Sequence, residues 1–243
     1  MKRILVAGAA GFLGVAVCEV LADKYEVRGI DLNPMPHLQD VIEADLSEFE
    51  AVATALQGVD GVINCMMARL DAYEKPDLPM RYNVVGLANL LEAARLEDVQ
   101  RFVHASTTGI FSVEQPDFIK ADSKAIAKGW YPITKLMQER FCENFAAAYG
   151  VEIAVMRIAG GIVCGRTWSE KDGTPLTKEN YGSHLICRYD VANACVMALE
   201  ASDIGFDIFH IGSTPECRAK NDVKHLSDRL GWKPEYDFEE NRP

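Results

Sequence analysis

The sequence has no excess of basic residues. Its 243 residues include 25 Lys and Arg against 36 Asp and Glu, which gives a formal net charge of −11. Nucleic-acid phosphates and anionic lipid surfaces both attract clustered Lys and Arg. No stretch reaches the roughly 18 uninterrupted apolar residues that a membrane-spanning helix needs. We therefore expect neither nucleic acid nor a membrane among the partners of this protein.

The seven cysteines form no recognisable motif. Their number is odd, no pair has C-x-x-C spacing, and the five histidines are scattered. This pattern predicts no metal site and indicates reduced thiols, which are typical of the cytoplasm. The basic start at Lys2 and Arg3 and the apolar run that follows resemble a secretory leader, but the run contains three glycines and no cleavage site follows it. We therefore expect a cytoplasmic protein.

Glycine and proline are too few for a collagen-like or low-complexity chain, at 18 and 10 residues. Apolar runs instead alternate with segments of helical periodicity, which predicts an α/β fold with a doubly wound parallel sheet. We expect Asp190 to cap its helix. The expected strands are residues 3–9, 26–32, 41–46, 61–67, 101–107, 152–158 and 206–212. The expected helices are residues 11–24, 47–56, 79–95, 131–149, 190–201 and 221–230.

Two segments near the C-terminus break this alternation. They have no clear periodicity apart from one short helix, and we expect them to fold together over the carboxyl edge of the sheet. Open α/β sheets bind ligands at that edge. The prediction is a nucleotide-binding domain of residues 1–159 and 188–213, with a small substrate-binding lobe of residues 160–187 and 214–243.

Three glycines follow the first strand at regular spacing and open the first helix. Glycine allows a tight turn and a close backbone approach to a pyrophosphate, which then lies at the helix N-terminus. Asp31 ends the second strand, where a carboxylate accepts hydrogen bonds from a ribose diol and repels a 2′-phosphate. The prediction is a Rossmann-like domain that binds NAD, with contacts at Gly8, Gly11, Phe12, Leu13 and Gly14.

Tyr131 and Lys135 are four residues apart near the start of a predicted helix, so both lie on one face. Oxidation of a secondary alcohol needs a base, and a free phenol, with a pKa of about 10, is too basic. A nearby ammonium and a positive nicotinamide ring lower that pKa. We predict that Tyr131 is the catalytic base, and that Lys135 assists it and holds the cofactor ribose.

The G-x-x-G-x-x-G spacing resembles the short-chain dehydrogenase/reductase superfamily, in particular its extended branch, the NAD-dependent epimerase/dehydratase family. The segments 44–46, 62–67 and 83–94 are similar to family elements in the same order, and the likeness covers roughly residues 2–158 and 188–199. The resemblance implies a homodimer formed through helices 79–95 and 131–149. It also implies further cofactor contacts at Asp45, Leu46, Met66, Asn83 and Ser106.

The segment 105–111 is similar to the family's substrate-binding strand end. This resemblance implies that Thr107 orients the reacting oxygen, with Thr108 as the alternative. Family dehydratases have an Asp-Glu pair directly after the active Thr, and here Thr108 and Gly109 stand there. Dehydration is therefore not expected.

The two irregular segments are short for a nucleotide-sugar enzyme of this family, which favours a smaller substrate such as a sugar or sugar acid. Uronate dehydrogenases resemble the chain at residues 1–11, 157–158 and 230–234. Arg69 and Arg166 are candidates to clamp a substrate carboxylate. We expect an NAD-dependent dehydrogenase or reductase. The alternatives are an epimerase that retains its NAD, and a non-catalytic NAD sensor or scaffold.

Overall fold

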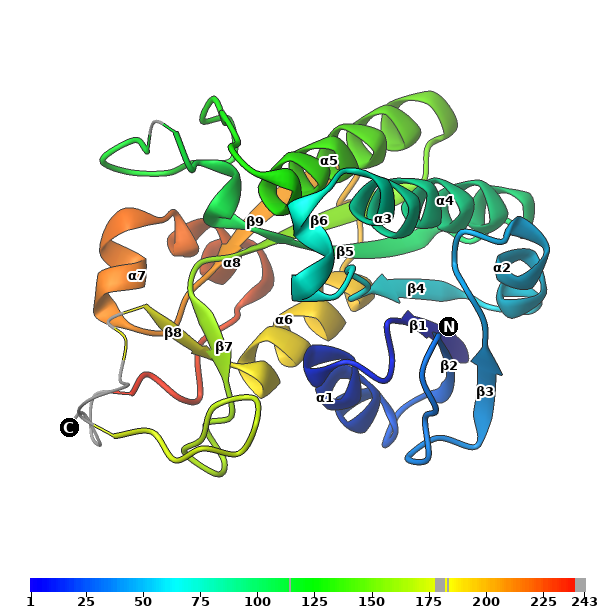
Figure 1. Cartoon of the computed structure of the whole chain (residues 1–243), viewed down its shortest axis with the longest axis horizontal. Helices are drawn as coiled ribbons and strands as arrows, with labels where there is room; N and C mark the ends of the chain where they lie inside the picture. The colour runs from blue at the N-terminus through cyan, green and yellow to red at the C-terminus, as the bar shows by residue number, and fades with distance from the viewer. Residues whose placement is uncertain (114, 178–181, 183, 239–243) are drawn as a thin grey trace.

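A computed structural model describes residues 1–113, 115–177, 182 and 184–238. Its centre is a seven-stranded sheet in the order β3-β2-β1-β4-β5-β6-β9, and every neighbouring pair is parallel (Figure 1). The strands are β1 (Arg3–Ala7), β2 (Glu26–Asp31), β3 (Asp40–Glu43), β4 (Gly61–Asn64), β5 (Arg101–Thr107), β6 (Glu152–Ile158) and β9 (Phe206–Ile211). The expected parallel sheet is confirmed.

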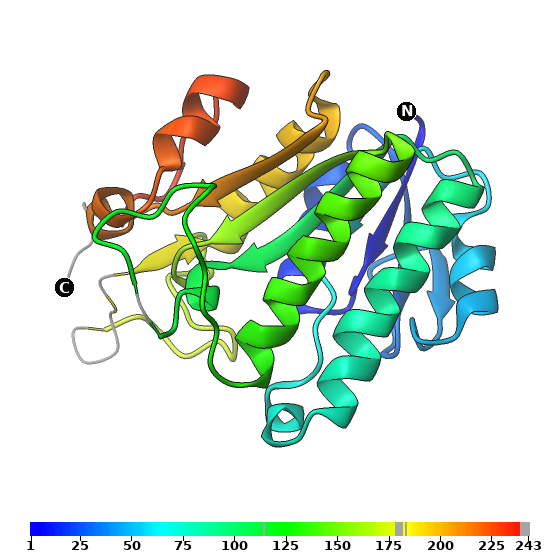
Figure 2. The same ribbon diagram turned by 90° about the horizontal axis from the view of Figure 1, so that it is seen from above.

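Helices cover both faces of the sheet. The helices α1 (Phe12–Leu21) and α6 (Arg188–Glu200) pack on one face, and α2 (Phe49–Leu56), α4 (Gly86–Leu96) and α5 (Trp130–Tyr149) pack on the other (Figures 1 and 2). Alternate strand residues point to opposite faces. In β1, Ile4 and Val6 therefore join the first core, and Leu5 and Ala7 join the second. Among the described residues, no helix is both long and apolar enough to cross a membrane.

The expected helix 79–95 is divided into three pieces. A short α3 (Asp77–Pro79) leads into the π-helical turn η2 (Met80–Val85), and α4 follows. The wider turn surrounds Asn83, whose carbonyl oxygen accepts a hydrogen bond of 2.7 Å from the Gln138 side chain on α5. Such π turns often occur at functional sites, and this one lies beside the start of α5.

The two irregular segments contain one expected helix and further elements that periodicity did not show. The expected helix 221–230 is α8 (Val223–Leu230). The unexpected elements are a parallel pair, β7 (Gly161–Val163) and β8 (Leu185–Cys187), before α6, and α7 (Pro215–Lys220) after β9. Side chains of both segments, including Val163 and Trp232, belong to the same apolar core as α1 and α6. These segments therefore share a core with the sheet, and the division into two domains remains a prediction.

The expected capping role of Asp190 is wrong. The cap of α6 is Cys187, and Asp190 lies in the first turn, where it is 1% exposed. Its carboxylate accepts hydrogen bonds from the backbone N–H groups of Glu235 (2.8 Å) and Tyr236 (3.1 Å). Burial raises the pKa of Asp190 to about 6. This carboxylate thus ties the C-terminal segment to α6.

Two histidines are buried in the sheet. Burial, with a smaller contribution from the positive charge of Lys135, holds the pKa of His104 well below its ordinary value. Burial also lowers the pKa of His210 from 6.5 to about 3, and the positive charge of Arg157 acts in the same direction. Both imidazoles are therefore neutral in the folded protein at neutral pH, whereas in the unfolded chain they bind protons below about pH 6.5.

This difference predicts acid sensitivity. As pH falls from 6.5 to about 3, His210 is protonated only in the unfolded chain, so the free energy of unfolding falls by up to about 1.4 kcal/mol per pH unit. The variant His210→Gln does not titrate there. We expect it to lose less stability than the wild type when urea unfolding is compared at about pH 7 and pH 4. Equal losses in the two proteins would contradict the prediction.

Candidate active site

The turn between β1 and α1 has room for glycine alone at two positions. Gly8 has a φ of +77°, and a Cβ there would lie 2.8 Å from the backbone N and Cα of Met66. A Cβ at Gly14 would lie 2.1 Å from the Gly8 carbonyl oxygen. The helix cap Gly11 supplies no side-chain hydrogen bond, so the first N–H groups of α1 are open to an anion. This cradle fits a dinucleotide pyrophosphate.

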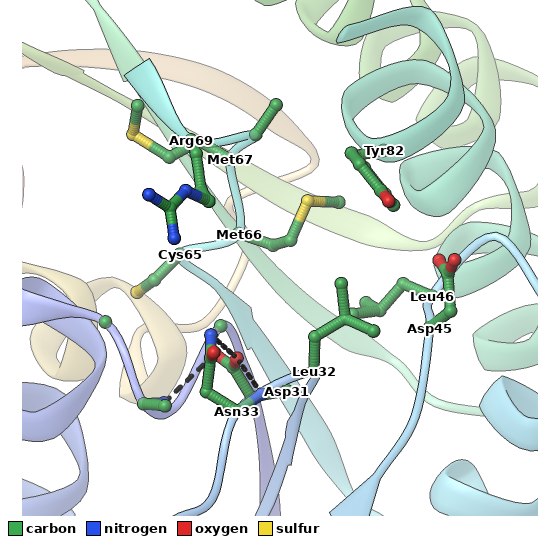
Figure 3. Close-up of a pocket in the computed structure, with 14 residues that line it drawn as sticks. Asp31, Leu32, Asn33, Asp45, Leu46, Cys65, Met66, Met67, Arg69 and Tyr82 are labelled. Atoms are coloured by element: carbon green, nitrogen blue, oxygen red, sulfur yellow. Dashed lines mark hydrogen bonds between the residues drawn. The ribbon is translucent and has the colours of Figure 1, made fainter. Parts of the chain in front are cut away.

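Asp31 lies beside that turn at the end of β2. One carboxylate oxygen accepts a hydrogen bond from the Ala10 N–H (3.1 Å), and the other accepts from the backbone (2.9 Å) and side chain (3.0 Å) of Asn33 (Figure 3). Asp31 is 9% exposed and lines a cavity. Because a carboxylate oxygen accepts more than one hydrogen bond, Asp31 retains capacity for a ribose diol.

This first cavity has a volume of about 390 Å³, and the lining shown in Figure 3 is largely apolar. Its far wall includes the half-buried Tyr82 and Asp45, whose carboxylate accepts a hydrogen bond of 2.8 Å from Arg81. The cavity therefore has a glycine turn at one end and the Tyr82 ring with the Asp45 carboxylate at the other, an arrangement that suits an adenosine. Of the predicted site residues, it brings together Gly8, Gly11, Asp31, Asp45, Leu46, Met66 and Arg69.

A second, smaller cavity of about 140 Å³ adjoins the first, and both are lined by Gly11, Cys65 and Met67. The two cavities therefore form one cleft along the carboxyl ends of the strands. A dinucleotide with its adenosine in the first cavity extends toward the second. The second cavity brings together Gly11, Phe12, Leu13, Gly14, Ser106, Tyr131 and Lys135.

Tyr131 and Lys135 lie in the first turns of α5, above the end of β5. The Lys135 ammonium donates a hydrogen bond of 2.8 Å to the Ala105 carbonyl oxygen, and burial lowers its pKa from 10.5 to about 8. Burial raises the pKa of Tyr131, and a hydrogen bond with the Thr107 side chain acts in the opposite direction. In the protein alone, burial thus outweighs the expected stabilisation of the phenolate, so a positive charge brought by the cofactor is needed to favour it.

The three hydroxyl residues after Ala105 have different environments. The Thr107 side chain lies close enough to Tyr131 to lower its pKa, although it lines neither cavity, and its hydroxyl oxygen accepts from the Gly109 N–H (3.0 Å). The Thr108 hydroxyl donates to the carbonyl oxygen of Ile158 (3.4 Å), a residue that lines the second cavity, but Thr108 itself lines neither cavity. Ser106 lines the second cavity. Thr107 is thus the hydroxyl residue in contact with the predicted base.

Asn83 lines neither cavity and acts through its hydrogen bonds. Its amide oxygen accepts from the Ala68 N–H (2.7 Å), and its amide nitrogen donates to the hydroxyls of Tyr73 (3.0 Å) and Thr134 (2.9 Å). The Tyr73 ring contacts the Tyr131 ring edge-on at 5.2 Å. No sequence pattern pointed to Tyr73, because it lies in η1 (Leu70–Glu74), an irregular connection without periodicity.

A buried ion pair lies behind Ser106, one of the residues that line the second cavity. Arg157 on β6 and Glu139 on α5 are each 4% exposed at their side chains and lie 2.8 Å apart. The Ser106 hydroxyl donates to the same carboxylate at 2.6 Å. This pair fixes the position of Ser106. In the sequence, this ion pair is visible only as an arginine, Arg157, within an apolar strand. An arginine there predicts a buried ion pair only once its acidic partner is known.

The two arginines predicted to bind substrate lie outside the cavity that contains Tyr131 and Lys135. Arg69 lines the first cavity rather than the second, its side chain is 87% exposed, and it pairs with Asp71 at 3.3 Å. Arg166 lines neither cavity. It lies over the Tyr189 ring at 3.5 Å, with Glu19 at 3.9 Å. The geometry thus places both arginines away from the second cavity.

A doubly wound parallel sheet, a glycine cradle at the first helix and a carboxylate at the end of β2 define the class of Rossmann-type dinucleotide-binding proteins. Within this class, the pair Tyr131 and Lys135 is the feature that resembles short-chain dehydrogenases. The chain belongs to the NAD dependent epimerase/dehydratase family, whose model matches residues 4–166. Members of this family depend on NAD, which is the cofactor that the cleft fits.

Individual relatives include both dehydrogenases and epimerases. The chain is similar to a uronate dehydrogenase of Agrobacterium fabrum, at 34% identity over 166 residues, 65% of this chain and 61% of that protein. It therefore matches about three fifths of that relative's length. It is also similar to a UDP-glucose 4-epimerase of Corynebacterium glutamicum, at 27% identity over 94% of this chain and 80% of that protein. The crystal structure of a uronate dehydrogenase from Agrobacterium tumefaciens has a TM-score of 0.77, with 28% identity, and covers 97% of this chain and 85% of its own.

The cradle predicts a steric effect on cofactor binding. In Gly14→Ala the new methyl group meets the Gly8 carbonyl oxygen, so the turn must open. We expect NAD affinity, measured by calorimetry, to fall at least about tenfold, a loss of about 1.4 kcal/mol. The control is Gly150→Ala, at the end of α5, where φ is +73° and nothing lies within 4 Å. It should reduce stability and leave NAD affinity unchanged. Equal NAD affinity in Gly14→Ala and wild type would contradict the prediction.

Proposed function

We propose that the protein is an NAD-dependent oxidoreductase that interconverts a sugar-like secondary alcohol and its carbonyl compound. The observation that carries this proposal is the presence of Tyr131, Lys135 and Ser106 in a small cavity that adjoins the dinucleotide cavity. NAD supplies the hydride acceptor when it is bound. A proton acceptor beside the cofactor's reactive end is what alcohol oxidation further needs.

Each residue has a distinct part in this proposal. Tyr131 removes the proton of the substrate hydroxyl, and Thr107, whose side chain lies close to that phenol, orients the reacting oxygen. Lys135 holds the cofactor ribose and adds positive charge below the phenol. Burial of that ammonium, with its pKa near 8, strengthens its field in a medium of low dielectric constant.

The size of the second cavity favours dehydrogenase over epimerase. At about 140 Å³ it is small for a nucleotide-sugar, and the relatives named uronate dehydrogenases act, by that name, on uronates. An epimerase that keeps its NAD is the second candidate, favoured by the longer alignment with the UDP-glucose 4-epimerase. Nucleotide released on denaturation separates the two. Near-stoichiometric NAD or NADH indicates an epimerase, and an empty protein indicates a dehydrogenase.

Removal of the Tyr131 hydroxyl tests the proposed base. Tyr131→Phe should lower turnover at least about 100-fold, the usual contribution of a general base, and leave NAD affinity unchanged. The assay is NADH formation from sugars and uronic acids. Tyr149→Phe is the matched control, because that ring is 55% exposed at the far end of α5. A fully active Tyr131→Phe would refute the assignment. NAD binding without turnover of any alcohol or carbonyl compound would favour a sensor or scaffold.

We further propose a cytoplasmic homodimer that acts in carbohydrate metabolism. All seven cysteines are free, as a reducing compartment requires. The side of α5 that faces the sheet is largely polar, with Thr134, Lys135, Gln138 and Glu139 buried. Ile133, Met137 and Phe141 are half-buried and line part of an open hollow of about 460 Å³, although Phe141 also packs against the core. A second copy of the chain would cover them.

A charged residue introduced into the proposed interface tests whether the protein is a dimer. Met137→Asp should shift the mass measured by light scattering from dimer to monomer, because association would bury the new carboxylate. Val41→Asp, on the edge strand β3 and 38% exposed, is the control and should remain a dimer. A monomeric wild-type protein would refute this part of the proposal.

A further inference from the structure

The segment between β7 and β8 begins with a turn that is followed by a small hairpin. Cys164 and Ser169 close the first turn by exchanging backbone hydrogen bonds of 2.9 and 3.2 Å. In the hairpin that follows, the Leu176 N–H donates to the Trp168 carbonyl oxygen at 2.7 Å. The tip is closed by a turn in which the Gly173 N–H donates to the Glu170 carbonyl oxygen at 3.1 Å. Gly173 has a φ of +87°, which glycine adopts without strain. The backbone of the tip therefore has a defined shape.

The base of this hairpin is anchored in the protein core. The Trp168 ring packs edge-on against the Phe238 ring, with centroids 5.3 Å apart, and Phe238 is 1% exposed. Ser169 is buried, and its hydroxyl is hydrogen-bonded to that of Thr167 at 2.7 Å. An anchored base and a closed turn position the residue at the tip, which is Lys171.

Lys171 lines the second cavity, together with Tyr131 and Lys135. No Asp or Glu is among the described residues that line it. The Lys135 ammonium is buried and already donates to the Ala105 carbonyl oxygen. Lys171 is exposed, and with the described part of the chain it forms no hydrogen bond or ion pair. Both charges of the cavity are thus positive, and one has no partner.

From this geometry we infer that Lys171 is a specificity residue that binds the carboxylate of the substrate, so the substrate is a sugar acid rather than a neutral sugar. This inference rests on the proposed function. The cofactor pyrophosphate is the other anion within the cleft, but the open N–H groups of α1 already provide for it. Lys171, on the hairpin, is thus proposed to bind the substrate carboxylate in place of the sequence candidates Arg69 and Arg166.

The experiment compares a hexuronate with its uncharged primary amide, which differs from it chiefly by the charge. Binding is measured by calorimetry on the protein saturated with NADH, and turnover is measured with NAD. In the wild type the uronate should bind more tightly and have the lower KM. Lys171→Met should raise the dissociation constant and KM for the uronate about tenfold, as expected for one charge-assisted contact. The amide should be little affected.

Three controls define the result. Lys171→Arg keeps the charge and should retain the preference for the uronate. Lys233→Met removes an exposed lysine outside both cavities and should change nothing. NAD affinity should be the same in all variants. Weaker NAD binding in Lys171→Met, with an unchanged ratio of uronate to amide, would assign Lys171 to the cofactor phosphates and overturn the inference.

Failure of the proposed function has a different signature. If neither sugars nor sugar acids are oxidised, the oxidoreductase proposal fails, and calorimetry still reports on Lys171. Uronate binding that depends on Lys171 would then support an anion site without this chemistry. Absence of uronate binding to the wild type would overturn the inference, whatever the turnover of neutral sugars.

Discussion

The close contact between the first turn and its neighbours is the constraint on which the rest of the cleft depends. Gly8 lies against the backbone of Met66, and the start of α1 lies against the Gly8 carbonyl oxygen, at distances that exclude any Cβ. This contact brings the N-terminus of α1 to the carboxyl edge of the sheet, where its N–H groups are open to an anion. The position of the cofactor, and hence of any reacting substrate carbon, follows from it.

A second set of contacts joins that edge to the residues that we propose are catalytic. The hydrogen bonds of Asn83 tie Ala68 and Tyr73, in the segment after β4, to Thr134 on α5. The same segment contributes residues to both cavities. A π turn at the start of the long helix places Asn83 where these groups meet. The cofactor cleft and Tyr131 are therefore held by one hydrogen-bonded unit.

Burial decides the electrostatics of the site. The same removal from water that raises the pKa of Tyr131 lowers that of Lys135 to about 8. Neither change alone produces a phenolate. A cationic nicotinamide would shift the balance, since charges interact more strongly in a poorly solvated cavity. In the proposed mechanism, Tyr131 therefore accepts a proton only once the cofactor is bound.

Short-range patterns in the sequence were sufficient to predict the parallel sheet and several of the residues that line the cleft. Alternation of apolar runs and helical periods determined the parallel sheet, and local spacing determined the glycine turn and the pair Tyr131 and Lys135. Only the tertiary structure decided that Tyr73 contacts Tyr131, that Glu139 pairs with Arg157, and that Lys171 reaches the second cavity. The physical reason is the range of the interactions. Periodicity and turn chemistry act between neighbouring residues, whereas these contacts join segments far apart in the chain that meet only once the sheet has formed.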